Sequence, residues 1–332
     1  MDSAAILISV EKAITTDKER EYFWTHEERY RIILEEIKNL TDARVVQEIP
    51  PGSQQNLVQL QSERNASMDT KNLFAKGSED GSKFSLVTKR ALRSVRNLGA
   101  VVRANADGAA NYAPPRAEKL RVLDVGCFPY HLGAAMEMMG MEVWGIASGH
   151  EPIKNKKIAI LNIEKDKFPY KDNYFDLVVF TEVLEHLPQS PLHALKEIYR
   201  VLMPQGKMVL TTPNIARSIN RAKMILGKSV SYPLQQVLEN DGTGSNIYHR
   251  HNREYTLPEL STLTSHAGFV VSEARHFISY TPTRRRAIPD NVLLKTGKFT
   301  NYALMLAIAS LRDTLLIIGT KPLSRGFIKL PA

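Results

Sequence analysis

The sequence has one cysteine, Cys127, and no long uninterrupted hydrophobic run. A single cysteine excludes an intrachain disulfide framework and is typical of a reducing compartment. The longest apolar region, Tyr302 to Gly319, is interrupted by Arg312 and Asp313, so neither half is long enough to cross a bilayer. The apolar run near the N-terminus is too short for a signal peptide. These features predict a cytoplasmic protein.

Glycine is missing where a dinucleotide-binding turn would need it. The stretch Leu120 to Gly133, LRVLDVGCFPYHLG, reads as a buried strand, a turn at Gly126 and a helix. This arrangement holds nucleotide-type cofactors in doubly wound α/β domains. Phe128 and Tyr130 occupy positions where a pyrophosphate fingerprint requires glycine. The pattern therefore speaks against a dinucleotide, and Asp124 at the strand end favours a ligand with amino and hydroxyl groups.

Positive charge exceeds negative charge. Lys and Arg total 44 against 35 Asp and Glu, which gives a net charge of +9 and favours an acidic partner. The segment Phe84 to Arg103 predicts a basic amphipathic helix that could lie on an anionic membrane or on RNA, or could dock on the domain. A second cluster, Arg284 to Arg286, could bind phosphate or anionic lipid, or could form a solvated turn.

Further motifs follow the first strand in a fixed order. They are EVWGIAS (Glu142 to Ser148), FPYKDNYFDLVVFTEVLEHL (Phe168 to Leu187) and HALKEIYRVLMPQGKMVLTTPN (His193 to Asn214). Together they resemble the class I S-adenosylmethionine-dependent methyltransferases, in the broad group that includes ubiquinone-type O-methyltransferases and many bacterial glycan and natural-product enzymes. The resemblance covers Leu120 to about Thr320. It implies an α/β, Rossmann-like fold with a seven-stranded, mostly parallel sheet and one antiparallel strand.

Four parts of the chain are expected. Residues 1–40 should form a helical segment that packs on the core, with a helix starting at the capping box of Thr25 and Glu28. Residues 41–118 should be a largely disordered insert, because their polar composition buries too little surface, apart from the basic helix near 84–103. A methyltransferase domain should span 119–322, with a substrate-cap insertion near 215–255. Residues 323–332 would form a tail.

The resemblance implies S-adenosylmethionine as cofactor. It carries the cofactor contacts onto Asp124, Gly126, Cys127, Ser148, Asn162, Ile163 and Glu182. The motif I acid and turn would hold the methionine moiety, while Cys127 packs beside the cofactor. The usual ribose acid is replaced by Ala147, so Ser148 or Glu151 would take its role, and Asn162 stands where an acid usually meets the adenine amine. Glu182 is expected at the amino end of the cofactor.

Methylation of a hydroxyl requires a proton acceptor, and near pH 7 a neutral histidine is the usual choice. The candidates are His186, His249 and His251. The alternative for the last two is a purely structural capping loop in which Arg253 and Glu254 pair with each other.

Two carboxylates and a histidine follow the fourth predicted strand. On a short helix Glu182, Glu185 and His186 would share one face, where they could ligate a hard divalent ion. This pattern is similar to the E-x-x-E-H of metal-dependent small-RNA 2′-O-methyltransferases. Similar sequences also occur in superfamily members with no known metal, so no metal is the primary prediction.

Three functions compete. The first is O-methylation of a small molecule or of a glycan or lipid-linked intermediate, with an acidic acceptor if the basic segments face it. The second is a methyltransferase-fold scaffold without catalysis, which Phe128, Tyr130 and Ala147 favour. The third is a metal-dependent RNA 2′-O-methyltransferase. Peripheral contact with an anionic membrane fits the basic helix, and nucleic acid is the less favoured partner.

Overall fold

A computed structural model describes residues 2–47, 119–148, 156–231, 250–280 and 292–323, together with Leu234 and Tyr248. The chain divides into two compact units, residues 1–38 with 119–332, and residues 39–118. Of the second unit, only residues 39–47 are described. The predicted basic helix near 84–103, Glu151, the arginines at 284–286, His249 and residues 324–332 lie outside the described residues.

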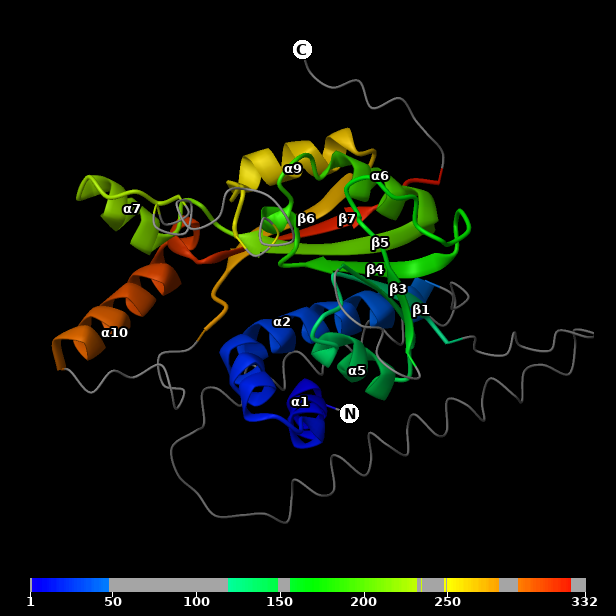
Figure 1. The fold of residues 1–332 in the computed structure, drawn as a ribbon, viewed down its shortest axis with the longest axis horizontal. Helices are drawn as coiled ribbons and strands as arrows, with labels where there is room; N and C mark the ends of the chain where they lie inside the picture. The colour runs from blue at the N-terminus through cyan, green and yellow to red at the C-terminus, as the bar shows by residue number, and fades with distance from the viewer. Residues whose placement is uncertain are drawn as a thin grey trace, which may run out of the picture. The chain divides into compact units, whose positions relative to one another are not determined.

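A seven-stranded sheet forms the centre of the first unit (Figure 1). Its strands are β1 (Arg121–Val125), β2 (Glu142–Ala147), β3 (Lys157–Ile160), β4 (Phe175–Thr181), β5 (Leu202–Pro213), β6 (Val270–Phe277) and β7 (Thr314–Thr320). Their order is β3-β2-β1-β4-β5-β7-β6. The pairs from β3 to β5 are parallel, and only β7 runs antiparallel to its neighbours β5 and β6. The predicted fold class is confirmed.

Helices cover both faces of this sheet. They are α1 (Ser3–Ala13), α2 (Asp17–Gln47), α5 (His131–Met138), α6 (Leu192–Val201), α7 (Ser218–Ile225), α9 (Leu257–His266) and α10 (Val292–Ala307), with short 3-10 turns η1 (Leu184–His186) and η3 (Ala309–Leu311). In Figure 1, α1, α2 and α5 lie on one face, and α6 and α9 lie on the other. Within the described part, no helix combines the length and the apolar character that crossing a membrane requires.

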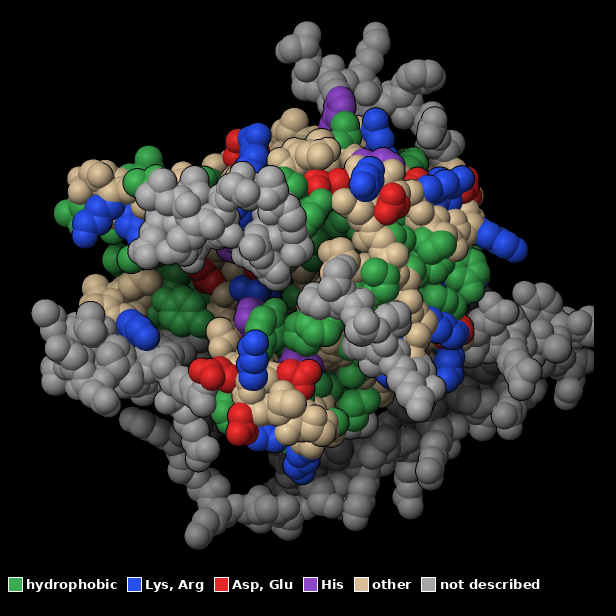
Figure 2. All heavy atoms as spheres, viewed as in Figure 1, with side chains coloured by type: hydrophobic (Ala, Val, Ile, Leu, Met, Phe, Trp, Pro, Cys, Tyr) green, Lys and Arg blue, Asp and Glu red, His purple; other side chains and the backbone are tan. Residues whose placement is uncertain are grey.

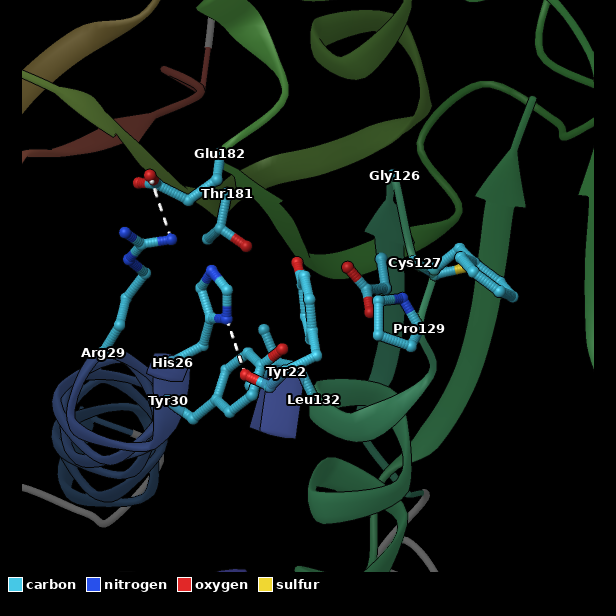
Figure 3. Close-up of a pocket in the computed structure, with 12 residues that line it drawn as sticks. Tyr22, His26, Arg29, Tyr30, Gly126, Cys127, Pro129, Leu132, Thr181 and Glu182 are labelled. Atoms are coloured by element: carbon cyan, nitrogen blue, oxygen red, sulfur yellow. Dashed lines mark hydrogen bonds and ion pairs between the residues drawn. The ribbon is translucent and has the colours of Figure 1, made fainter. Parts of the chain in front are cut away.

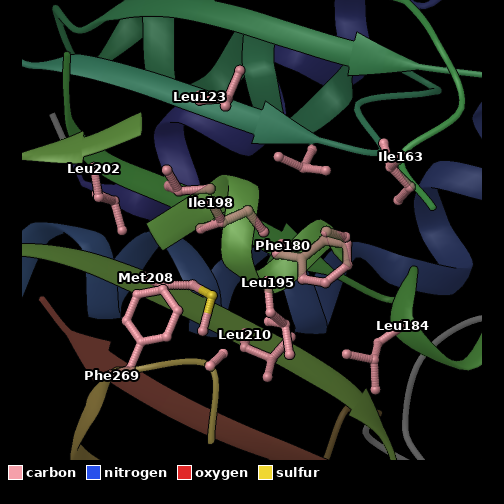
Figure 4. Packing of buried hydrophobic residues seen from close by; sticks show 14 of the residues in the cluster. Leu123, Ile163, Phe180, Leu184, Leu195, Ile198, Leu202, Met208, Leu210 and Phe269 are labelled. Atoms are coloured by element: carbon pink, nitrogen blue, oxygen red, sulfur yellow. The ribbon is translucent and has the colours of Figure 1, made fainter. Parts of the chain in front are cut away.

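The central strands are buried because their sequences are apolar on both faces. Val122, Leu123 and Val125 of β1 and Val178, Val179 and Phe180 of β4 are fully inaccessible, as expected for strands covered by helices on both sides. Figure 4 shows Phe180, Leu195, Ile198 and Leu210 packed together between the sheet and α6. This packing fixes the ends of the strands from which the candidate site is built.

Helix boundaries follow local capping chemistry. Thr256 and Glu259 form a capping box at the start of α9, and Gly268, at φ +106°, follows the end of this helix. The predicted helix start at Thr25 is wrong. Helix α2 begins at Asp17, because the Thr16 hydroxyl accepts a hydrogen bond from the Glu19 N–H at 3.2 Å. Thr25 lies inside the helix and donates to the Glu21 carbonyl.

Candidate functional site

The carboxyl ends of the parallel strands meet at one edge of the sheet, where open α/β sheets bind ligands. Asp124 and Gly126 lie at the end of β1, Ser148 follows β2, Asn162 follows β3 and Glu182 follows β4. The Gly126 N–H donates to the Ile146 carbonyl at 2.8 Å, which joins the first turn to β2. The topology thus brings together residues that are separated by almost sixty positions in the sequence.

Gly126 is required by its surroundings as well as by its backbone. It has φ +85°, and a Cβ at this position would lie 2.2 Å from Cγ2 of Val183. Cys127, next in the turn, is buried, and this burial, helped by the Asp124 charge, raises the pKa of its thiol to about 12. Cys127 is therefore a packing residue with an unreactive thiol.

Asp124 is a buried acid without a compensating partner. Its exposed fraction is 3%, and burial alone raises the pKa of its carboxyl to about 7. Among the described residues no donor forms a hydrogen bond with its carboxylate. The charged form of Asp124 would therefore be stabilised by a cationic ligand in the adjacent hollow, which Asp124 lines together with Gly126, Cys127 and Glu182.

Helix α2 supplies residues that no sequence motif indicated. Tyr22, His26 and Arg29 line the cavity from this helix, opposite the Gly126 turn (Figure 3). Arg29 Nη1 lies 3.0 Å from Oε2 of Glu182, and both side chains are mostly buried. Arg29 Nε is buried and has no hydrogen-bond partner within the described structure. The spacing of Tyr22, His26 and Arg29 by four and three positions was the available signal, because it places them on one helical face.

His26 stacks on Tyr22 with ring centroids 4.1 Å apart. Burial lowers the pKa of His26 to about 4, so this ring is neutral at pH 7. Glu182 takes φ +55° and also accepts a hydrogen bond from Thr211 Oγ1 at 2.9 Å. Arg29 and Thr211 therefore hold the carboxylate of Glu182 in place at the end of β4.

Asn162 is oriented by a hydrogen-bond network that reaches the cap segment. Its Oδ1 accepts from the Glu164 N–H, and its Nδ2 donates to the Tyr248 hydroxyl at 2.9 Å. The Tyr248 hydroxyl donates in turn to Glu164. Because a carbonyl oxygen has two lone pairs, Oδ1 of Asn162 still has capacity to accept one bond from a ligand amine.

Two of the three candidate histidines meet at the other end of the site. The rings of His186 and His251 are edge to face, 4.8 Å between centroids. His186 Nδ1 lies 3.1 Å from the Arg250 carbonyl, and His251 Nδ1 lies 2.9 Å from Oε1 of Glu254. An acceptor beside Nδ1 places the ring proton there, so in each neutral ring Nε2 carries the lone pair.

Glu254 links His251 to Arg217 and not to Arg253. Burial acts to raise the pKa of Glu254, but hydrogen bonds from His251 and Arg217 overcome it and hold the pKa down at about 2. Arg253 instead reaches Glu259, 3.1 Å away. The suggested pairing of Arg253 with Glu254 is therefore wrong, and Glu254 has a different structural role: it orients the His251 ring.

Glu185, His186 and His251 form a group whose ligand atoms all lie within 4.8 Å of one another. Glu185 is 1% exposed, and burial, followed by the charge of Glu182, raises its pKa. The group differs from the set expected from the sequence, because His251 takes the place of Glu182. Its imidazole and carboxylate donors suit a divalent ion.

A single cavity of about 560 Å³ connects the two ends of the site. Its lining includes the predicted residues Gly126, Ser148, Asn162, Ile163, Glu182, Glu185, His186 and His251, and also Ala147, Phe128, Tyr22, His26 and Arg29. Its volume is within the range of small-molecule and cofactor sites. Figure 2 shows one side of the described surface around this region, with purple histidine and blue basic side chains between green apolar groups.

Comparisons with known proteins identify a methyltransferase domain in this chain. A family model described as "Methyltransferase domain" matches residues 96–274, more than half of the chain. The chain is 30% identical over 118 residues to the ubiquinone biosynthesis O-methyltransferase of Proteus mirabilis (strain HI4320), covering 31% of this chain and 47% of that one. Against the enzyme of the same name from Aeromonas salmonicida (strain A449) it is 27% identical over 164 residues, covering 46% and 64%.

These matches span less than two thirds of the length of those curated relatives. A solved S-adenosylmethionine-dependent methyltransferase from Archaeoglobus fulgidus superposes with a TM-score of 0.41 at 17% identity, covering 61% of this chain and 87% of that one. The family model extends from before β1 into β6 and includes the ends of β1 to β5, from which the cavity is built. The chain therefore belongs to the methyltransferase-domain family, within the class I S-adenosylmethionine-dependent methyltransferase superfamily.

Proposed function

We propose that this protein transfers a methyl group from S-adenosylmethionine to a hydroxyl oxygen of a small molecule, or of a glycan or lipid-linked intermediate. The observation that carries this proposal is the single cavity that has strand-end cofactor positions at one end and two oriented histidines at the other. Methyl transfer needs two ligands aligned in one enclosed site, and this cavity offers room for both.

The residues present fit the amino-acid end of the cofactor. Its ammonium group would meet the unpartnered carboxylate of Asp124, and its carboxylate would meet Arg29, whose buried Nε has no partner among the described residues. The first contact would pair a buried charge, and the second would give a partner to a buried donor, and both groups are otherwise costly. Asn162 and Ser148 also line the cavity, where Asn162 would meet the adenine amine and Ser148 would offer a hydroxyl to the ribose.

S-adenosylmethionine supplies an electrophilic methyl group when it is bound. The protein's own residues then have to orient the acceptor and remove its proton. His186 is the favoured proton acceptor, because its Nδ1 contact with the Arg250 carbonyl leaves the lone pair on Nε2. His251, held by Glu254, lies against the same ring and provides the second basic nitrogen.

The test combines cofactor binding with turnover. The purified chain is titrated calorimetrically with S-adenosylmethionine and S-adenosylhomocysteine, and then supplied with phenols, sugars and lipid-linked alcohols while S-adenosylhomocysteine formation is followed. His186→Gln should lower kcat by about 10²- to 10⁴-fold, with cofactor affinity unchanged. His193→Gln is the matched control, because His193 contacts the Asp166 carbonyl and is not part of the cavity lining. Equal turnover in both variants would contradict the role of His186.

A metal-dependent reaction, including RNA 2′-O-methylation, is the alternative that Glu185, His186 and His251 favour. Chelation separates the two functions. We expect turnover to survive treatment with EDTA, because His186 alone can accept the proton. Loss of turnover with EDTA and recovery with Mg²⁺ or Zn²⁺ would instead assign these three residues to a metal.

A scaffold without catalysis makes a different prediction for Ala147. This residue ends β2 at the cavity wall, where the family places an acid for the ribose. In an active cofactor site, Ala147→Asp should tighten S-adenosylmethionine binding about tenfold or more, since a charged hydrogen bond contributes roughly 1.5–3 kcal/mol. No gain in affinity, together with no binding by the wild type, would favour the scaffold.

A further inference from the structure

Helices α7 and α10 expose most of the apolar side chains that the structure describes in them. In α7 only Asn220 is buried, while Ile219, Met224 and Ile225 are exposed, Ile225 by 85%. In α10 and the residues after it, Phe299, Leu304, Leu306 and Ile308 are exposed, and Met305 is the one buried apolar side chain among those described. A helix of a globular protein normally turns such side chains toward a core. Exposed apolar side chains in this number therefore indicate a surface that binds another molecule.

The two helices form one surface. The guanidinium of Arg221 in α7 donates to the carbonyl and hydroxyl of Ser310, in the turn that follows α10. Asn214, just before α7, donates to the carbonyls of Ser310 and Arg312. Figure 1 shows both helices on the same side of the sheet, projecting beyond its edge. We call the exposed side chains of residues 219–228 and 298–308 the α7–α10 surface.

The charge on this surface has one sign. Arg221, Lys223, Lys228 and Lys298 are exposed on it, and the sequence has no Asp or Glu from Ile198 to Leu238 or from Val292 to Arg312. Arg221 is hydrogen-bonded to groups that carry no charge, the Ala216 carbonyl and Ser310. In Figure 2, green apolar and blue basic side chains lie together over α7.

We infer that the α7–α10 surface docks the protein on an anionic membrane. Exposed apolar side chains bordered by lysine and arginine are the pattern of helices that lie in the plane of the interface. Each cation near an anionic leaflet adds to the attraction. A second copy of this chain is the poorer occupant, because a symmetric contact would place its cations against the same cations of the partner without an acid to pair them.

The surface adjoins the candidate site. Pro213 at the end of β5 lines the cavity, and α7 begins five residues later. Docking through α7 would therefore bring the histidine end of the cavity close to the membrane surface. The choice of a lipid-linked acceptor over a water-soluble one rests on the proposed function, whereas the docking does not.

Vesicle co-sedimentation of the full chain tests the docking without cofactor or acceptor. We expect binding to phosphatidylcholine vesicles that contain phosphatidylglycerol, weak binding to pure phosphatidylcholine, and a loss of binding as salt screens the charges. The double variant Ile225→Ser, Leu226→Ser should weaken binding about tenfold or more, because it removes two large apolar side chains from the contact. Lys223→Glu with Lys228→Glu should abolish the preference for anionic vesicles.

The matched control replaces an exposed apolar residue and an exposed cation elsewhere, Ile8→Ser with Lys171→Glu. It should bind like the wild type, and all variants should show the wild-type circular dichroism spectrum. The inference is overturned if the wild type does not bind anionic vesicles, or if the control variant loses as much binding as the α7 variants. A further outcome would also overturn it: the wild type sediments as a dimer, and the double variant Ile225→Ser, Leu226→Ser sediments as a monomer. The α7–α10 surface would then bind a second copy of the chain. None of these results depends on methyl transfer.

Discussion

At the scale of single residues, the site contains a buried acid without a hydrogen-bond partner and a buried arginine nitrogen without one, among the residues that the structure describes. Asp124 is held at the end of β1 by a sheet that buries it completely, and Arg29 reaches the same cavity from α2 with one nitrogen unpartnered within the described structure. Such groups lower the stability of the free protein. Buried groups of this kind are expected where a ligand provides the missing partners. Replacing such a group should therefore raise the stability of the free protein and lower its affinity for the ligand.

Asp124→Asn should show this opposition. The pKa of Asp124 is about 7 in the folded protein and near 3.8 in the unfolded chain, so the folded state holds its proton more tightly. The stability of the free protein therefore falls as pH rises between these two values, and the full cost is present above the folded pKa. At about pH 8 the free energy of unfolding of the variant should be higher than that of the wild type by on the order of 4 kcal/mol, while cofactor binding is lost. Urea titrations at acid and alkaline pH measure the difference.

At about pH 3, where both states are protonated in the wild type, this gain should vanish. If Asp124→Asn is no more stable than the wild type at alkaline pH, the conclusion that the Asp124 carboxylate lacks a stabilising partner is wrong. In the wild type, cofactor affinity should also decrease as pH falls below the folded pKa, because a protonated Asp124 offers no charge to an ammonium group.

Arg29→Ala tests the contribution of α2 to the cofactor site. Removing a charged donor from a largely buried position should raise the dissociation constant for S-adenosylhomocysteine about tenfold or more. Arg31→Ala is the control, since Arg31 lies on the same helix and pairs with Glu28 and Glu35 away from the cavity lining. If calorimetry gives the same affinity for both variants, Arg29 serves only to hold Glu182.

At the scale of secondary-structure elements, the ends of helices decide which side chains reach the cavity. Helix α2 begins at Asp17, well before the first turn that a capping box at Thr25 would give. Because of this early start, Tyr22 and His26 lie on the helix and project toward the strand ends with Arg29. A helix that began after Thr25 would have left Tyr22 in a loop.

Thr16→Ala should destabilise the protein by about 1 kcal/mol, because the Thr16 hydroxyl satisfies a backbone N–H in the first turn of α2. Thr25→Ala should change stability by less than about 0.5 kcal/mol, since Thr25 is exposed inside the helix and alanine has the higher helix propensity. Chemical denaturation of the two variants measures both values. A larger loss of stability for Thr25→Ala than for Thr16→Ala would contradict a helix start at Asp17.

At the scale of the whole molecule, the cavity belongs to one compact unit that contains both tryptophans, Trp24 on α2 and Trp144 on β2. Tryptophan fluorescence therefore reports the unfolding of the unit that should bind the cofactor. This gives a way to detect binding that depends neither on the acceptor nor on turnover.

S-adenosylhomocysteine at about one hundred times its dissociation constant should add roughly 2.7 kcal/mol to the stability of this unit. For a domain of this size, the fluorescence melting temperature should rise by about 5–10 °C. Asp124→Asn should melt at the same temperature with and without the ligand. A wild-type melting temperature that does not move, in a protein that is folded, would argue against the cofactor site and against the proposed activity together.

The sequence alone determined the fold class, because its information is local. Apolar runs of strand length, the turn at Gly126 and the capping box at Thr256 and Glu259 specify elements from neighbouring residues, and the seven-stranded sheet that the family resemblance implied is present. The cofactor positions at the strand ends could also be predicted from the sequence, because parallel strands place their carboxyl ends at one edge of the sheet. Their roles in binding stay predictions until cofactor titration.

Only the tertiary structure decided which distant residues meet. Arg29 and Glu182 pair across more than a hundred and fifty positions, His251 replaces Glu182 beside Glu185 and His186, and Glu254 pairs with Arg217 instead of Arg253. No local pattern encodes these contacts, because they depend on how helices pack on a sheet whose order differs from the order of the chain. The exposure of α7 and α10 is also decided by tertiary packing: apolar side chains predict burial, and only the structure shows that most of the described apolar side chains of these helices are exposed.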